Sequence, residues 1–147
     1  MDSYSVLATA AVAAPRTIGT LIASTARRGH VEAFSLSCEG APADNTIIWK
    51  LQRCTTTGTV TSTTPAAKDP ASPAASLSSG QNASAEPTYT ANTILWEGGL
   101  NQRSLARIVY APGKELLTNT TSNNGMGMTA NHASATPTVD AVFEWTE

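Results

Sequence analysis

Apolar and polar residues alternate along much of this 147-residue chain with a period of two. The clearest alternation is in residues 138–147, which place Val139, Ala141, Phe143 and Trp145 on one side and Asp140, Val142 and Glu144 on the other. Residues 45–54 follow the same pattern, with Ile47, Trp49 and Leu51 on one side. Successive side chains of a β-strand point to opposite faces, so both segments are predicted strands with one buried face. Trp49 and Trp145 are then candidates for opposing anchors of one core.

Weaker alternation predicts several further strands. They are expected within residues 4–13, 17–25, 30–39 and 103–111, around Ile94 and Trp96, and around Met126 and Met128. Residues 40–45 have turn chemistry and predict a hairpin that joins the strand before them to the Trp49 strand, while Gly98 and Gly99 are expected to stop the Trp96 strand. Roughly seven to nine short strands and no helical stripe predict an all-β fold, either an antiparallel β-sandwich or a jelly-roll-like barrel.

The length favours a single β domain over residues 1–147, because a chain cut near its middle would leave pieces too small to fold well alone. Residues 1–14 are expected to form an N-terminal strand or arm, set apart by Pro15 and able to pair with a neighbouring subunit. Residues 55–80 are expected to form a long loop rich in Thr, Ser, Pro and Ala. Two interpretations stay open for it: an ordered surface excursion with a Thr-rich β-ribbon around Gly58, or a flexible, mucin-like segment.

Charged residues make up 14% of the chain, and the formal net charge is −2. A nucleic-acid-binding surface needs clustered Lys and Arg, so this balance argues against a nucleic-acid partner. The adjacent pair Arg27 and Arg28 is interpreted as part of a solvated turn. Residues 1–19 superficially resemble a signal peptide but lack its basic start, and no run is apolar enough to span a membrane. We therefore expect mature sequence and no membrane partner.

The two cysteines, Cys38 and Cys54, are not predicted to form a disulfide. In the hairpin expected around residues 40–45, Cys38 lies opposite Ile47 and Cys54 extends well beyond that partner. At about 3.3 Å per residue, the two sulfur atoms would be more than ~20 Å apart, which is too far for a bond. Free cysteines are typical of a reducing compartment and act most often as small core residues.

The residues able to carry catalysis are few and scattered. His30 lies beside a predicted turn and His132 in a loop rich in Ser, Thr and Asn, and neither has the spacing of a zinc ligand. Asp140 and Glu144 share one strand face at about 13 Å, farther apart than the paired carboxyl groups of glycosidases. We therefore predict no catalytic, cofactor-binding or metal-binding residues, no small-molecule ligand and no enzyme activity. A Cys-His dyad assembled in space is the one exception left open.

A surface of small Ala, Ser and Thr residues suits extended, flat contacts between subunits, because these side chains lose little entropy when they are buried. Such a surface indicates binding by shape complementarity within an assembly of many copies of the chain. It points to no particular residue as a site.

Four segments carry a resemblance to a known family. They are the apolar N-terminal strand, residues 49–75 with a Thr/Gly run followed by Asp-Pro, residues 94–102 (ILWEGGLNQ), and residues 125–147, which close on alternating apolar residues and an acid. In these segments the chain resembles small structural proteins of bacteriophage virions, the capsid decoration or cement proteins.

The resemblance implies a non-enzymatic β-sandwich protomer that binds the outer surface of the major capsid protein shell and stabilises the icosahedral head. It also implies a homotrimer on threefold axes, made in the cytoplasm of the bacterial host and located on the outer surface of the phage head. The family carries no catalytic residues over to this chain. Two alternatives remain: a tail or neck ring or fibre-associated component, and a carbohydrate-binding module that would use the three Trp side chains as platforms.

Overall fold

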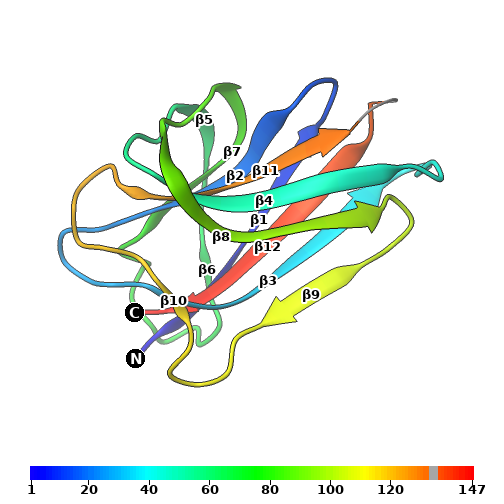
Figure 1. Ribbon diagram of the computed structural model, residues 1–147. Helices are drawn as coiled ribbons and strands as arrows, with labels where there is room; N and C mark the ends of the chain where they lie inside the picture. The colour runs from blue at the N-terminus through cyan, green and yellow to red at the C-terminus, as the bar shows by residue number, and fades with distance from the viewer. Residues whose placement is uncertain (133–135) are drawn as a thin grey trace.

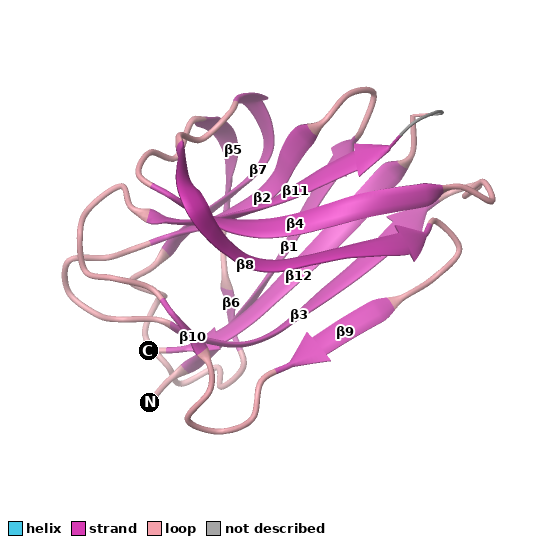
Figure 2. Cartoon of the chain, in the orientation of Figure 1, coloured by secondary structure: helices cyan, strands magenta, loops and turns pink. Residues whose placement is uncertain are grey.

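The computed structural model describes residues 1–132 and 136–147, which form two antiparallel sheets packed face to face (Figure 1). The predicted all-β class is confirmed, and Figure 2 shows only strands and loops in this part of the chain. None of its elements is a helix long and apolar enough to cross a membrane. Of the two predicted architectures the β-sandwich is observed, because the sheets stay separate. Residues 133–135, part of the segment 125–147 singled out above, lie outside the described residues.

Each sheet contains six strands. Sheet A has the order β10, β3, β12, β1, β6, with β9 also paired to β3. Its strands are β1 (Ser3–Ala11), β3 (His30–Glu39), β6 (Ala66–Ala67), β9 (Ala106–Val109), β10 (Leu116–Leu117) and β12 (Thr138–Thr146). Sheet B has the order β5, β7, β2, β11, β4, β8. Its strands are β2 (Arg16–Ile22), β4 (Thr46–Cys54), β5 (Thr59–Thr63), β7 (Ser78–Ala85), β8 (Tyr89–Asn101) and β11 (Gly125–His132).

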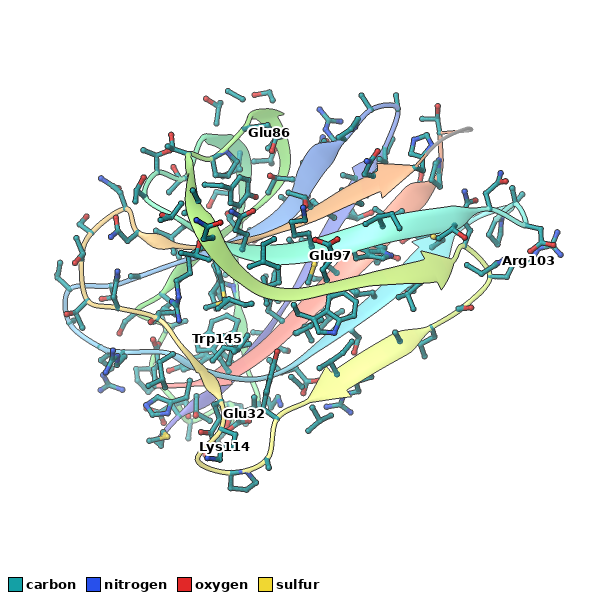
Figure 3. The ribbon with its side chains drawn as sticks, in the orientation of Figure 1. Glu32, Glu86, Glu97, Arg103, Lys114 and Trp145 are labelled. Atoms are coloured by element: carbon teal, nitrogen blue, oxygen red, sulfur yellow. The ribbon has the colours of Figure 1, made fainter. Side chains whose placement is uncertain are left out.

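The core lies between the sheets and is filled by the inward-facing side chains of both. Trp49 of β4 is 1% exposed and Trp145 of β12 is fully buried, and they enter the core from opposite sheets as predicted. Figure 3 shows Trp145 between the two layers. Tyr4 stacks on Trp145 with ring centroids 5.7 Å apart, and its hydroxyl donates to the carbonyl oxygen of Pro73 at 3.0 Å. The predicted buried faces of residues 45–54 and 138–147 are thus confirmed.

The strands that pair are not neighbours along the chain. Among the described strands, no two consecutive ones are hydrogen-bonded to each other. The hairpin predicted across residues 40–45 is wrong, because β3 belongs to sheet A and β4 to sheet B. The turn chemistry is present, with Gly40 at a φ of 74°. However, the apolar faces of β3 and β4 meet across the core, which places the two strands in opposite sheets.

The first strand, β1, is an integral part of sheet A and not a free N-terminal arm. It pairs with β12 over all nine of its residues. Its other edge pairs with the short strand β6, and farther along the Thr9 N–H donates to Oε1 of Gln81 at 3.0 Å. Both edges of β1 therefore carry intrachain hydrogen bonds, so the strand is not available as a free edge for pairing with a neighbouring subunit.

Residues 55–80 form an ordered crossing between the sheets and not one long loop. The segment contains β5 at an edge of sheet B and β6 at an edge of sheet A, and β7 begins at Ser78. The predicted Thr-rich ribbon around Gly58 is not formed, because β5 pairs with β7. Gly58 has a φ of 65°, and a Cβ atom there would lie 2.2 Å from the carbonyl oxygen of Ala85, so the position requires glycine. Leu77 is buried, and its N–H donates to the Glu147 carboxylate at 3.2 Å. These contacts contradict the flexible, mucin-like interpretation.

The strand through Trp96 is longer than its glycines indicate. The prediction that Gly98 and Gly99 stop it is wrong, because β8 continues to Asn101. Gly98 leaves room for the Trp96 ring, which would come within 2.7 Å of a Cβ atom at that position. The ring packs edge-on against Phe34 of sheet A, with centroids 5.4 Å apart. This glycine therefore provides space for an indole that helps to close one edge of the sandwich.

Gly19 of β2 marks a close approach of the two sheets. A Cβ atom there would lie 2.7 Å from Cβ of Ala8 and 3.0 Å from Cε2 of Phe143. We expect Gly19→Ala to lower the free energy of unfolding by about 1–3 kcal/mol, because overpacking a dense core forces its neighbours to shift. Urea denaturation measures the loss, with Gly99→Ala as the control, since a Cβ there meets only exposed side chains at 3.3 Å. A loss for Gly19→Ala no larger than that of the control would contradict the packing described.

Candidate interaction surfaces

The residues considered for catalysis are not gathered into one site. His30 begins β3 and His132 ends β11, so they lie in opposite sheets. His132 is in a strand and not in the expected loop, and its Nε2 contacts the carbonyl oxygen of Val12. Within the described residues, Cys38 and Cys54 are both free thiols. The same residues contain no group of three or more His, Cys, Asp or Glu side chains that could hold a metal ion.

Both thiols are placed where the thiolate is disfavoured. Burial raises the pKa of Cys54 to about 11. Burial also raises the pKa of Cys38, and the negative charge of Asp140 adds to that shift. The thiolate is the nucleophilic form of cysteine, so neither side chain is prepared for covalent chemistry at neutral pH. The hairpin register from which the separation of these sulfur atoms was predicted does not exist, because β3 and β4 lie in different sheets.

The outer surface of sheet A, called the sheet A face below, is covered mainly with short side chains. Leu7 of β1 pairs with Val142 of β12, and Val142 pairs with Ser35 of β3. Val142 lies at the centre of this row, and Leu7 beside it is 51% exposed. The neighbouring outward positions on these three strands are Ser5, Thr9, Ser37, Asp140 and Glu144. Side chains of this size give up little entropy on burial, so the sheet A face is suited to a broad, flat contact.

One end of the sheet A face is an ion-pair cluster around Glu144. Its carboxylate contacts Lys68 at 2.7 Å and Arg107 at 2.6 Å. The hydrogen bond from Lys68, reinforced by the charges of Lys68 and Arg107 against partial burial, holds the pKa of Glu144 below its ordinary value. Asp140 and Glu144 share this face of β12 as predicted, but Glu144 is engaged by cations and not by a second carboxyl group.

The opposite end of the sheet A face is acidic. Coulomb repulsion from Asp140, the side-chain hydrogen bond between the two carboxyl groups and partial desolvation raise the pKa of Glu39. Within the described part of the chain, Oδ1 of Asp140 is buried without a hydrogen-bond partner. The chain thus leaves two carboxyl groups at this end opposed to each other, whereas it supplies two cations for Glu144.

A groove, called the sheet B groove below, runs along the outer surface of sheet B. It has a volume of about 340 Å³, and its wall includes Arg16, Lys50, Gln52, Glu86, Tyr89 and Asn131. Two smaller hollows share part of this wall, so the depression continues in both directions. Its floor and sides come mainly from β2, β11 and β4, the central strands of sheet B.

One end of the sheet B groove is built from a chain of hydrogen bonds. The Glu86 carboxylate accepts the Thr17 N–H at 3.0 Å and also accepts the Thr17 hydroxyl. Because that hydroxyl has only one proton, the Tyr89 hydroxyl must donate to Thr17 Oγ1, at 2.6 Å. Burial raises the pKa of Tyr89 above its ordinary value, so the phenol keeps its proton. A Cβ atom on Gly127 would lie 2.3 Å from the phenol oxygen, which shows that the tyrosine packs over this glycine.

Sequence reasoning did not find the sheet B groove. Thr17 and Tyr89 are 72 positions apart and meet only in the folded sandwich. Gly127 was the one available signal, since a glycine within a strand often marks a close approach by another group. The platform role considered for tryptophan is not supported: Trp49 and Trp145 are buried, and the ring of Trp96 packs on Phe34.

No protein-family model, curated protein or solved structure matches the chain. The chain folds into an antiparallel β-sandwich with one flat outer face and one grooved outer face.

The two ends of the sheet A face predict opposite pH dependences of stability. The pKa of Glu144 is lower in the folded chain than its ordinary 4.5, so the charged form of Glu144 stabilises the fold. Its contribution to the free energy of unfolding is present above pH 4.5 and is lost as the pH falls through the folded pKa. The pKa of Glu39 is raised above 4.5 in the folded chain, so the protonated form of Glu39 stabilises the fold relative to the charged form. This contribution to the free energy of unfolding is present below pH 4.5 and is lost as the pH rises through the folded pKa. We expect Glu144→Gln to lower the urea midpoint at about pH 7 and Glu39→Gln to raise it there.

Repeating both urea titrations at about pH 2.5, where the carboxyl groups of the unfolded chain are largely protonated, supplies the control. The effect of Glu144→Gln should shrink at this pH, and the gain from Glu39→Gln should disappear. Shifts that stay the same at both pH values would show that the substitutions act through packing and not through charge.

Proposed function

We propose that this protein is a non-enzymatic structural protein of a bacteriophage virion, a capsid decoration protein that binds the outer surface of the major capsid protein shell. The observation that carries the proposal is the sheet A face, an open sheet surface of short side chains around the exposed Leu7. The resemblance of residues 49–75, 94–102 and 125–147 to decoration proteins supports the same conclusion. A protein of this kind stabilises the icosahedral head through contact area and needs no catalytic group.

The charge pattern of the sheet A face supports docking to a partner. Glu144 already has two cationic partners, whereas Glu39 is held next to Asp140. A basic residue brought to this acidic end would relieve the repulsion and fix the orientation of the bound partner. We therefore expect the capsid shell to present a basic group opposite Glu39.

A homotrimer would present three copies of the sheet A face to the shell at a threefold axis. Linked contacts of this kind bind far more tightly than any one of them, because later contacts form at high effective concentration. The net charge of −2 agrees with a position on the outer surface of the head, away from packaged DNA. Synthesis would take place in the cytoplasm of the bacterial host.

Light scattering and a titration onto expanded heads, isolated from the phage that encodes the chain, test this function. We expect the mass of a trimer and saturable binding to heads. Val142→Arg should weaken head binding by about tenfold or more, because it places a long charged side chain at the centre of the flat contact. Gln52→Ala lies on the opposite side of the sandwich and is the matched control, with binding expected to equal that of the unaltered protein.

A larger ring that does not bind heads would overturn the decoration role and favour the tail, neck or fibre-associated alternative. Equal head binding by Val142→Arg and the unaltered protein would reject the sheet A face as the docking surface. Circular dichroism of Val142→Arg distinguishes the expected loss of head binding from misfolding, and Val142 is not among the buried core residues.

A further inference from the structure

We propose that the sheet B groove binds a neutral saccharide. The groove lies on the outer surface of sheet B, on the other side of the core from the sheet A face. A protomer docked through sheet A would therefore hold the groove toward solvent. Its volume of about 340 Å³ is near the lower end of small-ligand sites, which suits a short stretch of an oligosaccharide.

The charged side chains of the groove are already engaged within the chain. Lys50 pairs with Glu97 of β8 at 3.2 Å, and Figure 3 shows Glu97 on β8 and Glu86 near the start of that strand. The Arg16 guanidinium donates to two backbone carbonyl oxygens, at 3.1 and 3.0 Å. Glu86 accepts a backbone N–H at 3.0 Å and the hydroxyl of the same residue. A charged ligand would have to disrupt one of these pairings, so the groove favours a neutral one.

The polar groups left to a ligand are amides. Gln52 donates from Nε2 to the carbonyl oxygen of Thr90 at 2.7 Å, which orients its side chain and leaves Oε1 able to accept a hydroxyl. Asn131 is exposed at the other end of the groove and offers both a donor and an acceptor. Amide groups of this kind match the hydroxyl groups of a sugar, each of which can donate and accept.

Tyr89 gives the groove an aromatic side chain in a fixed orientation. Its hydroxyl is held by Thr17, which is itself held by Glu86, and its ring packs over Gly127. The apolar C–H face of a sugar ring can pack on such a side chain while its hydroxyl groups bond to the amides. Because the tyrosine is positioned before any ligand arrives, binding loses little additional entropy.

The position of the groove disfavours an extended peptide as its occupant. Peptides that add to a sheet bind along an open edge, where unpaired backbone groups form a new ladder. The sheet B groove instead crosses β2, β11 and β4, each of which has a hydrogen-bonded neighbour on both sides. Recognition here must come from side chains, as it does for a sugar.

A titration of the isotope-labelled full chain with neutral oligosaccharides, followed by amide NMR shifts, tests the proposal. The probes are maltohexaose, cellohexaose, mannohexaose and N-acetylated chitohexaose. We expect saturable shifts with at least one of them, centred on Gln52, Tyr89 and Asn131. The double variant Gln52→Ala, Asn131→Ala should bind about tenfold or more weakly, because it loses hydrogen bonds without touching the core. Ser35→Ala, on the sheet A face, is the matched control and should bind normally.

Shifts that are absent with all four sugars, or that centre on another surface, would overturn the proposal. Saturation by a flexible, uncharged peptide while the sugars have no effect would assign the groove to a polypeptide partner instead. Head binding is measured through Val142→Arg on the opposite face, so failure of either proposal is seen separately from failure of the other.

Discussion

Two β-sheets can pack only where their inward side chains fill one dry layer about 10 Å thick, and this requirement shapes the whole protein. Trp145 of sheet A and Trp49 of sheet B are the largest fully buried side chains, and Tyr4 extends the aromatic packing by stacking on Trp145. At Gly19 the sheets come close enough to exclude even a methyl group. The distance between the sheets is therefore set by large aromatic side chains at some positions and by Gly19 at another. The two largest buried aromatic residues, Trp49 and Trp145, lie in the interior and not on the surface.

The same requirement leaves the two outer faces free to differ. On sheet A the outward positions of β1, β3 and β12 are mostly short, so the surface stays flat around Leu7. On sheet B the segment that leads into β8 carries Glu86 and Tyr89 to the outer surface and closes one end of a groove. One sandwich therefore has two outer surfaces of different character: the sheet A face, for which we propose attachment to a shell, and the sheet B groove, for which we propose ligand binding.

The sequence predicted what depends on local alternation and missed what depends on topology. Residues 45–54 and 138–147 were recognised as strands because their apolar residues repeat every second position. The turn at residues 40–45 looked like a hairpin because turn chemistry is the same whether a chain returns to one sheet or crosses to the other. Gly98 looked like a stop because sequence does not show the Trp96 ring above it. The groove could not be predicted from the sequence because its side chains come from strands far apart in the chain.

The most direct test of the account is a cryo-electron microscopy reconstruction of expanded phage heads saturated with the protein, at a resolution that orients each sandwich. We predict that sheet A faces the shell, with Leu7 and Val142 in the contact and a basic group of the shell near Glu39. The groove beside Tyr89 should then open toward solvent. Attachment through sheet B, or through an edge of the sandwich with the sheet A face exposed, would contradict it.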